Sequence, residues 1–271
     1  MPDGSFDVVG LVPAAGRARR LPRLPCSKEL YPLGFRQDEQ GGDLQTEVVS
    51  QRLLDKFHKA GVSRAYIILR EGKWDIPAYF REGEKVGLSL AYVVITESLG
   101  PPDTLDRAYP FVKNDTVAFG FPDILFGPDD VFDRLLRRLE DANADVVLGL
   151  YPAVASGELD MVDVDKAGRV VGMLLKPKSA PLTFTWTCAV WRPRFTEFMH
   201  RFMQEERAKG DRASLAYEGI DAQGDLPVGA VIKRAVEENL QVHGVIFPDD
   251  TFRDIGTPRS LAGYTVSFSS Y

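Results

Sequence analysis

Apolar residues in the first half of the chain form short runs that alternate with amphipathic segments. The runs predict buried β-strands at residues 6–13, 65–69, 88–95, 116–119 and 146–150. Between them, helical spacing of apolar residues predicts helices at 46–60, 76–80, 103–111 and 130–139, and Gly61 is a stop signal for the first of these. This alternation is typical of an α/β fold with a parallel, doubly wound sheet.

The pattern changes after Tyr151. Two short apolar runs at 161–164 and 170–174 flank Asp165-Lys166-Ala167-Gly168, which predicts an antiparallel hairpin added to the sheet. Further strands are expected at 186–191 and 241–247, helices at 193–208 and 228–238, and an exposed loop or lid at 209–225. We find no internal repeat and no linker, so residues 1–271 are expected to form a single domain.

Composition narrows the class of protein. The chain has 271 residues, of which 44% are hydrophobic and 27% charged, as in a globular protein. Its 33 basic against 39 acidic residues argue against a nucleic-acid partner. Without an apolar run of about 20 residues or a basic start, neither a membrane span nor a signal peptide is expected. Two cysteines and three scattered histidines predict no disulfide framework and no zinc site, and a cytoplasmic location.

Candidate chemistry is concentrated between residues 11 and 33. The first predicted strand leads into the small residues Ala14, Ala15 and Gly16, and then into a group of cations: Arg17, Arg19, Arg20 and Lys28. Small residues let backbone N–H groups approach a phosphate, and Arg and Lys neutralise its charge. The alternative is a solvated basic loop beside a small-residue turn. The segment is not a Walker P-loop, because it lacks the G-x-x-x-x-G-K-[ST] pattern.

This segment resembles the opening signature of the sugar-1-phosphate nucleotidylyltransferases, also called sugar-nucleotide pyrophosphorylases. The family pattern is G-G-x-G-T-R-L followed by P-K-x-L-x-P-L; this chain has AGRARRL at 15–21 and SKELYPL at 27–33. By this resemblance Arg20 and Lys28 are the signature cations. Ala18 stands in place of a glycine, and Ser27 in place of the proline before the lysine.

Four later segments extend the resemblance, in the family's order, over about residues 8–261. ESLGPPDTL at 97–105 is similar to the G-T-A-x-A-L turn beside the nucleotide base, and FGFPDIL at 119–125 to the G-D-x-L segment. LKP at 175–177 is similar to E-K-P, and DIGTP at 254–258 to D-x-G-T-P. The family members it most resembles are the glucose-1-phosphate thymidylyl- and uridylyltransferases.

The resemblance implies a Rossmann-like doubly wound mixed sheet of the nucleotide-diphospho-sugar transferase type, with an antiparallel hairpin embellishment. Residues 1–150 would mainly bind the nucleotide and 151–271 the acceptor. It implies that Arg20 and Lys28 are catalytic and that Lys176 binds the acceptor phosphate. The residues expected to bind the nucleotide are Ala14, Ala15, Gly16, Leu99 and Gly100.

Two aspartates make up the expected metal site. Asp123 and Asp254 each follow a predicted strand, and ligands of open α/β sheets bind beyond the carboxyl ends of strands. Mg²⁺ binds through one or two carboxylates together with phosphate oxygens and water. The alternative for each residue is a turn or helix-capping role. With the resemblance, the pair is expected to hold Mg²⁺.

The expected reaction joins a nucleoside triphosphate and a sugar 1-phosphate, giving a nucleotide sugar and pyrophosphate. The acceptor side departs from the family: Leu175 replaces a glutamate, and Asp160-Met161 lacks an expected glycine, so acceptor specificity should differ from that of a standard glucose-1-phosphate enzyme. Transfer to a non-sugar phosphate, or a non-catalytic member that senses nucleotide sugars, are the alternatives. The base (thymine, uracil, cytosine or another), the sugar, and whether the chain forms a homo-oligomer stay open.

Overall fold

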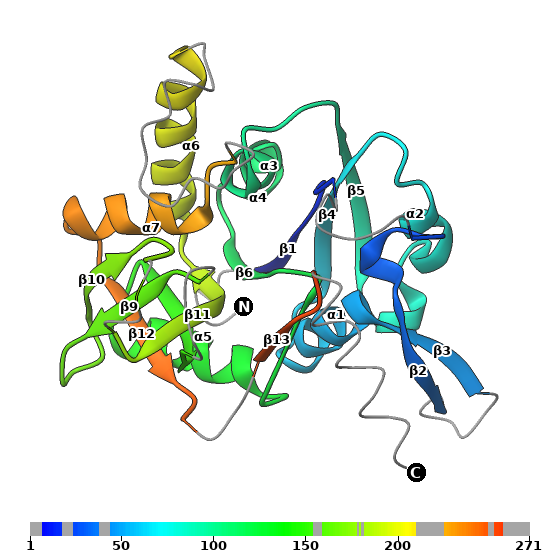
Figure 1. Cartoon of the computed structure of the whole chain (residues 1–271), viewed down its shortest axis with the longest axis horizontal. Helices are drawn as coiled ribbons and strands as arrows, with labels where there is room; N and C mark the ends of the chain where they lie inside the picture. Colours follow the sequence, from blue (N-terminus) through cyan, green and yellow to red (C-terminus); the bar gives the residue numbers. More distant parts are fainter. Residues whose placement is uncertain are drawn as a thin grey trace, which may run out of the picture.

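A nine-stranded mixed sheet runs through the centre of the computed structural model (Figure 1). The structure describes residues 7–17, 24–37, 44–153, 159–177, 179, 182–209, 225–248 and 252–256. The strands of the main sheet are β1 (Val8–Ala14), β4 (Arg64–Arg70), β5 (Ser89–Ile95), β6 (Thr116–Gly120), β8 (Val146–Pro152), β9 (Met161–Val164), β10 (Val170–Leu174), β11 (Phe184–Trp191) and β12 (Val242–Ile246).

The sheet combines a parallel block with an antiparallel one. Strands β5, β4, β1 and β6 lie side by side and parallel. β11 is antiparallel to β6 and β8, and β12 is parallel to β8. The β9–β10 hairpin attaches through β9 to the start of β11. The predicted mixed sheet with an antiparallel hairpin is therefore confirmed.

Helices cover both faces of this sheet and bury its central strands on both sides. Successive residues of β1 alternate between two cores: Val9 and Leu11 belong to one, Val12 and Ala14 to the other. The first core contains apolar residues of α3 (Pro101–Asp106), α4 (Tyr109–Val112), α6 (Pro193–Ala208) and α7 (Val228–Glu237). The second contains those of α1 (Val49–Lys59), α2 (Asp75–Phe80) and α5 (Val131–Asp141). The sheet is thus doubly wound, as the sequence predicts.

The prediction is wrong at two strand pairs. The segment expected to be loop up to residue 42 contains the short 3-10 helix η1 (Lys28–Leu30) and strand β2 (Pro32–Gln37). β2 pairs with β3 (Leu44–Val48), so residues 46–48 are strand and the helix expected from 46 begins at Val49. β7 (Ile124–Phe126) and β13 (Phe252–Asp254) pair although about half of the chain length separates them. Both pairs depend on cross-strand partners, which local periodicity does not reveal.

The helix expected at 103–111 is divided into α3 and α4. Pro110 is the second residue of α4 and has no N–H to continue a helical hydrogen-bond ladder, so the helix is interrupted before it. The other predicted strands and helices are confirmed to within a few residues. The exposed loop expected at 209–225 lies almost entirely outside the described residues.

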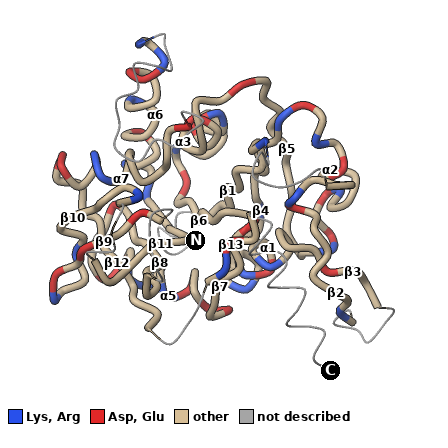
Figure 2. Tube along the Cα trace, in the orientation of Figure 1, with Lys and Arg blue, Asp and Glu red and all other residues tan. Residues whose placement is uncertain are grey.

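Charge is mixed over the surface. Figure 2 shows acidic and basic residues interspersed along most elements, including α6 and α7. Among the helices that the structure describes, none is both long and apolar enough to cross a membrane.

The centre of the sheet leaves no space for a side chain at Gly10. A Cβ there would lie 2.7 Å from a ring carbon of Phe57 and 2.8 Å from the Cβ of Ala65. We expect Gly10→Ala to lower the free energy of unfolding by about 1–3 kcal/mol through overpacking, measured by urea denaturation. Gly172→Ala is the matched control, since its Cβ would meet only the Cβ of Asp163, at 3.8 Å. Equal stability of the two variants would contradict the overpacking argument.

Candidate active site

The candidate site lies where three parallel strands end. β1 leads into Ala15 and Gly16, β4 into the segment with Lys73 and Asp75, and β6 into the turn with Asp123. The carboxyl ends of β4 and β6 flank that of β1, because both strands pair with β1 in parallel register. Ligands of open α/β sheets bind at this edge.

Lys28 lies at the centre of the site. Its ammonium group forms an ion pair with Asp123, and a Cβ on Gly16 would lie 3.9 Å from its Nζ. Burial disfavours the charged form, but the charges of Asp123, Glu29 and Asp254 and the hydrogen bond to Asp123 outweigh it, so the pKa of Lys28 is raised. Lys28 is therefore a shielded but fully charged cation beside the small-residue turn.

Asp123 and Asp254 are brought together by the short sheet of β7 and β13. Asp254 lies opposite Ile124, and the backbone N–H of Ile255 donates to the backbone carbonyl of Asp123 at 3.0 Å. The Oδ1 atom of Asp254 accepts a hydrogen bond of 2.6 Å from the N–H of Gly256. Two carboxylates 131 residues apart in the sequence thus lie on either side of one strand pairing, close to Lys28.

This pair fits a magnesium ion that is shared with substrate. Carboxylate oxygens are the hard donors that Mg²⁺ prefers, and the ion binds through one or two of them plus phosphate oxygens and water. Within the described ranges no group of three or more His, Cys, Asp or Glu side chains could hold a metal.

The residue before Lys28 is fixed by Asp75. The backbone N–H of Ser27 donates to Oδ2 of Asp75 at 2.6 Å, and its hydroxyl donates to Oδ1 at 2.7 Å. The φ angle of Ser27 is −56°, within the range of proline. Two hydrogen bonds to one carboxylate thus hold Ser27 in the conformation that the proline of the family pattern adopts by its ring.

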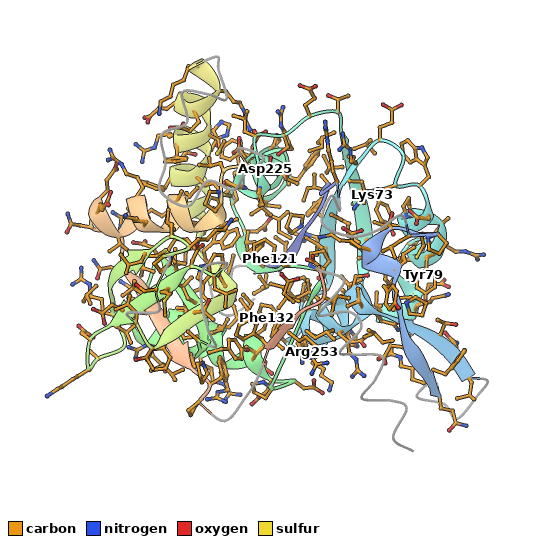
Figure 3. All side chains as sticks on the ribbon, in the orientation of Figure 1. Lys73, Tyr79, Phe121, Phe132, Asp225 and Arg253 are labelled. Carbon is orange, nitrogen blue, oxygen red and sulfur yellow. The ribbon has the colours of Figure 1, made fainter. Side chains whose placement is uncertain are left out.

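The residue after Lys28 is fixed by a second pair. Glu29 is buried, and the ammonium of Lys73 donates to its two carboxylate oxygens at 2.7 and 2.8 Å. Lys73 lies in the connection between the end of β4 and the start of α2 (Figure 3). Burial lowers the pKa of Lys73, although the charge of Glu29 opposes the shift. Sequence reasoning missed Lys73 and Asp75, which lie outside every motif, and gave no role to Glu29, which occupies the variable position after Lys28 in the SKELYPL segment.

In the segment expected to border the base, the backbone groups of Leu99 and Gly100 already form hydrogen bonds within the chain. The N–H of Leu99 donates to Asp103 at 2.9 Å, and its carbonyl accepts from Leu226 at 2.8 Å. The N–H of Gly100 donates to the hydroxyl of Ser98 at 3.1 Å. Gly100 has φ 143°, and a Cβ there would lie 2.3 Å from the backbone oxygen of Leu226. Glycine is required here, but these backbone groups are already engaged.

A buried ionic cluster anchors this segment to α6. Arg207 donates from Nε to Asp103 at 2.7 Å and lies 2.7 Å from a carboxylate oxygen of Asp106. His200 bonds to Asp106 at 2.8 Å and stacks on Tyr109, with ring centroids 3.7 Å apart. α3 is thereby tied to α6, which brings an element of the second half of the chain to the expected base site.

Lys176 lies apart from these groups, at the end of β10. It is half-buried, and its φ of 41° is in the left-handed region that lysine rarely adopts. Burial raises the pKa of Asp160, and the charge and the backbone N–H of Lys176 oppose this shift. Leu175 is buried, and one of its methyl groups would lie 2.9 Å from a Cβ on Gly229 in the first turn of α7.

Two further sequence predictions concern residues near the small-residue turn. Ala14 is buried as the last residue of β1, whereas Gly16 and Arg17 are exposed. Arg20, the other expected catalytic cation, lies outside the described residues.

A pocket of about 360 Å³ lies between α6 and α7. Leu175, Phe202 and Ala230 form its apolar wall, and charged side chains of both helices line the rest. Neither Lys28 nor the two aspartates line it, so it is separate from the edge of the sheet described above.

Comparisons with known proteins reveal the fold. No family model and no curated protein matches the chain. A Bacillus anthracis structure described as a glucose-1-phosphate thymidylyltransferase, in complex with sucrose, matches at a TM-score of 0.75 with 15% identity, covering 97% of this chain and 96% of that one. A UDP-glucose pyrophosphorylase complexed with UDP-glucose matches at 0.73 with 13% identity, covering 96% and 98%. Over nearly its whole length, the chain therefore has the fold of the nucleotidylyltransferases that its sequence motifs resemble.

Proposed function

We propose that this chain is a nucleotidylyltransferase that uses Mg²⁺, a nucleoside triphosphate and a sugar 1-phosphate to form a nucleotide sugar and pyrophosphate. The observation that carries the proposal is the group formed by Lys28, Asp123 and Asp254 beside Gly16. A shielded cation next to a small-residue turn suits a triphosphate, and the two carboxylates suit the ion that accompanies it. The fold and the ligands named for its two structural neighbours support the same class of reaction.

The reaction needs positioning and charge neutralisation more than a protein nucleophile. An oxygen of the acceptor phosphate attacks the α-phosphorus of the triphosphate in line, and the bond to the pyrophosphate oxygen breaks. The attacking oxygen is already anionic near neutral pH, so no general base is required. The chain's contribution is to hold both polyanions at the strand ends and to oppose their mutual repulsion.

Lys28 performs the second task. Its raised pKa keeps it protonated throughout the neutral range, and among the described residues its ion-pair partner is Asp123. A triphosphate offers the same ammonium a denser negative charge. Asp123 and Asp254 would hold Mg²⁺, which when bound supplies charge neutralisation and alignment of the phosphates. Arg20 is proposed to add a further cation from the segment after the small-residue turn.

The two substrates are proposed to bind at different strands of the sheet, the triphosphate after β1 and the acceptor at β10. Ala15 and Gly16 are proposed to accept the triphosphate, with Ala14 as the buried base of their turn and Leu99 and Gly100 bordering the nucleotide. Lys176, at the end of β10, is proposed to bind the acceptor phosphate. Transfer to a non-sugar phosphate is the second candidate, because the buried, apolar Leu175 stands in place of the motif's acid.

Pyrophosphate release tests the reaction directly. The protein is mixed with Mg²⁺, each nucleoside triphosphate in turn, and glucose, galactose, mannose, amino-sugar and deoxy-sugar 1-phosphates, with phosphocholine as a non-sugar acceptor. Release that depends on one triphosphate and one sugar 1-phosphate supports the proposal. Release with phosphocholine alone favours the second candidate. Binding without release in every mixture would show a non-catalytic nucleotide-binding protein.

Replacing Lys28 tests the central cation. We expect Lys28→Ala to fold normally and to lower kcat/KM at least tenfold, since loss of one charge-stabilising contact costs about 2–4 kcal/mol in transition-state stabilisation. Lys59→Ala, which removes an exposed lysine of α1, is the control and should retain full activity. Unchanged kinetics in folded Lys28→Ala would remove Lys28 from the mechanism.

The two aspartates should behave as one metal site. Asp123→Asn and Asp254→Asn each remove one negative charge at constant volume, so half-maximal activity should need at least tenfold more Mg²⁺. The double variant should lose less than the product of the single losses, because both residues serve one ion. Asp141→Asn, at an exposed position of α5, is the control. A magnesium dependence like that of the parent in both single variants would support turn roles instead.

The hydrogen bonds of Ser27 should matter for activity through Lys28. Asp75→Ala removes both bonds and should lower kcat about tenfold or more, because a hydrogen bond to a charged group contributes about 1.5–3 kcal/mol. Ser27→Pro in the Asp75→Ala background should recover part of the loss, since proline fixes φ near the observed value. If Asp75→Ala keeps full kcat, the pair has no positioning role.

A further inference from the structure

Asp160 lies where the acceptor half of the proposed site lacks its expected acid. In the β9–β10 hairpin Met161 pairs with Leu174, and continuing this register by one position places Asp160 opposite Leu175. Both side chains lie against the same residue of α7: a Cβ on Gly229 would lie 2.2 Å from Oδ2 of Asp160 and 2.9 Å from Cδ2 of Leu175. Only glycine at position 229 leaves room for the carboxylate.

The carboxylate of Asp160 is incompletely paired. Its Oδ1 atom is buried and accepts no hydrogen bond from the part of the chain that the structure describes. Two neighbours favour the ionised form of the carboxyl group: Lys176, through its charge and its backbone N–H, and Trp186, through its side chain. The backbone is fixed, since the hydroxyl of Thr185 donates to the carbonyl of Asp160 at 2.8 Å. A buried acceptor oxygen without a donor costs free energy unless a ligand supplies one.

We infer that Asp160 reads hydroxyl groups of the acceptor, replacing across the strand pair the acid that position 175 lacks. The inference rests on the proposed function, in which the neighbouring Lys176 binds the acceptor phosphate. An ionised carboxylate can only accept hydrogen bonds, so its ligand must donate. The ligand that offers an anion to Lys176 and O–H donors to Asp160 is a polyhydroxylated phosphate monoester, such as a sugar 1-phosphate.

Burial makes Asp160 costly to the fold. It raises the pKa of Asp160 to about 6, against the opposing effect of Lys176. A carboxyl group whose pKa is higher in the folded than in the unfolded protein lowers the stability once the pH exceeds its pKa in the unfolded chain. For Asp160 the full loss of stability is present above about pH 6. A purely structural role, such as an electrostatic contribution to the first turn of α7, would instead make Asp160 stabilising at pH 8.

Binding and stability together test the inference. Calorimetric titration at pH 8 with glucose, galactose and mannose 1-phosphates identifies the tightest, and its single-deoxy analogues are then titrated as well. We expect Asp160→Asn and Asp160→Ala to weaken binding of the intact sugar 1-phosphate about tenfold or more, with the affinity for the triphosphate unchanged. One deoxy analogue should bind the parent protein weakly and should bind Asp160→Ala with the same affinity. The hydroxyl that this analogue lacks is then the one that Asp160 contacts.

The controls separate contact from structure. Asp163→Asn, at an exposed position of the same strand, should leave sugar 1-phosphate affinity and melting temperature unchanged. Asp160→Asn should raise the melting temperature at pH 8, where a structural role predicts a fall. Leu175→Glu in the Asp160→Ala background should recover part of the affinity, because it returns a carboxylate to the same pair of positions.

The outcomes distinguish this inference from the proposed function. Unchanged sugar 1-phosphate affinity in folded Asp160→Asn and Asp160→Ala overturns the role of Asp160 and leaves nucleotidylyl transfer standing. Pyrophosphate release with phosphocholine and no binding of any sugar 1-phosphate also overturns it, while transfer itself stands. The remaining outcome is a parent protein that releases no pyrophosphate while the Asp160 variants bind sugar 1-phosphate more weakly than the parent does. That outcome supports a role of Asp160 in binding sugar hydroxyls and contradicts nucleotidylyl transfer.

Discussion

The ion pair between Lys28 and Asp123 is the interaction on which the candidate site depends. Burying either charge alone would cost several kcal/mol, so each requires the other. Lys73 donates hydrogen bonds to both carboxylate oxygens of the buried Glu29, while Lys28 forms its ion pair with Asp123. Two pairs of opposite charges therefore lie at the carboxyl edge of the sheet, and Lys28 is held in place there by its ion pair with Asp123.

The central strands of the main sheet could be predicted from sequence because they are buried on both faces and form nearly continuous apolar runs. β2 and β3 could not, since β2 contains proline and glycine, β3 is short and largely polar, and each is strand only through its pairing with the other. β7 and β13 are still less visible, because each is three residues long and its partner lies far along the chain. Local patterns indicate which segments are buried, but strand pairing depends on tertiary structure.

The candidate site shows the same division between motif residues and their supports. Lys28, Asp123 and Asp254 follow from motifs, whereas Asp75 lies 48 residues from Ser27 and is an ordinary polar residue in sequence. Asp160 is hidden for a geometric reason. The register of the β9–β10 hairpin shifts between Val170 and Gly172, so an unbulged hairpin would place Asp160 opposite a different residue of β10. Only the bulge brings it opposite Leu175.

A short segment before and within α7 contacts both Gly100 and Asp160. Leu226 donates its N–H to the carbonyl of Leu99 and closely contacts Gly100, which fixes the segment expected beside the base. Three residues later, Gly229 provides the space that the carboxylate of Asp160 occupies. Because so few residues separate these contacts, a displacement of the start of α7 would alter both at once. The start of α7 therefore packs against both Gly100 and Asp160, through a backbone contact at the first and a side-chain contact at the second, and neither Gly100 nor Gly229 leaves room for a larger side chain.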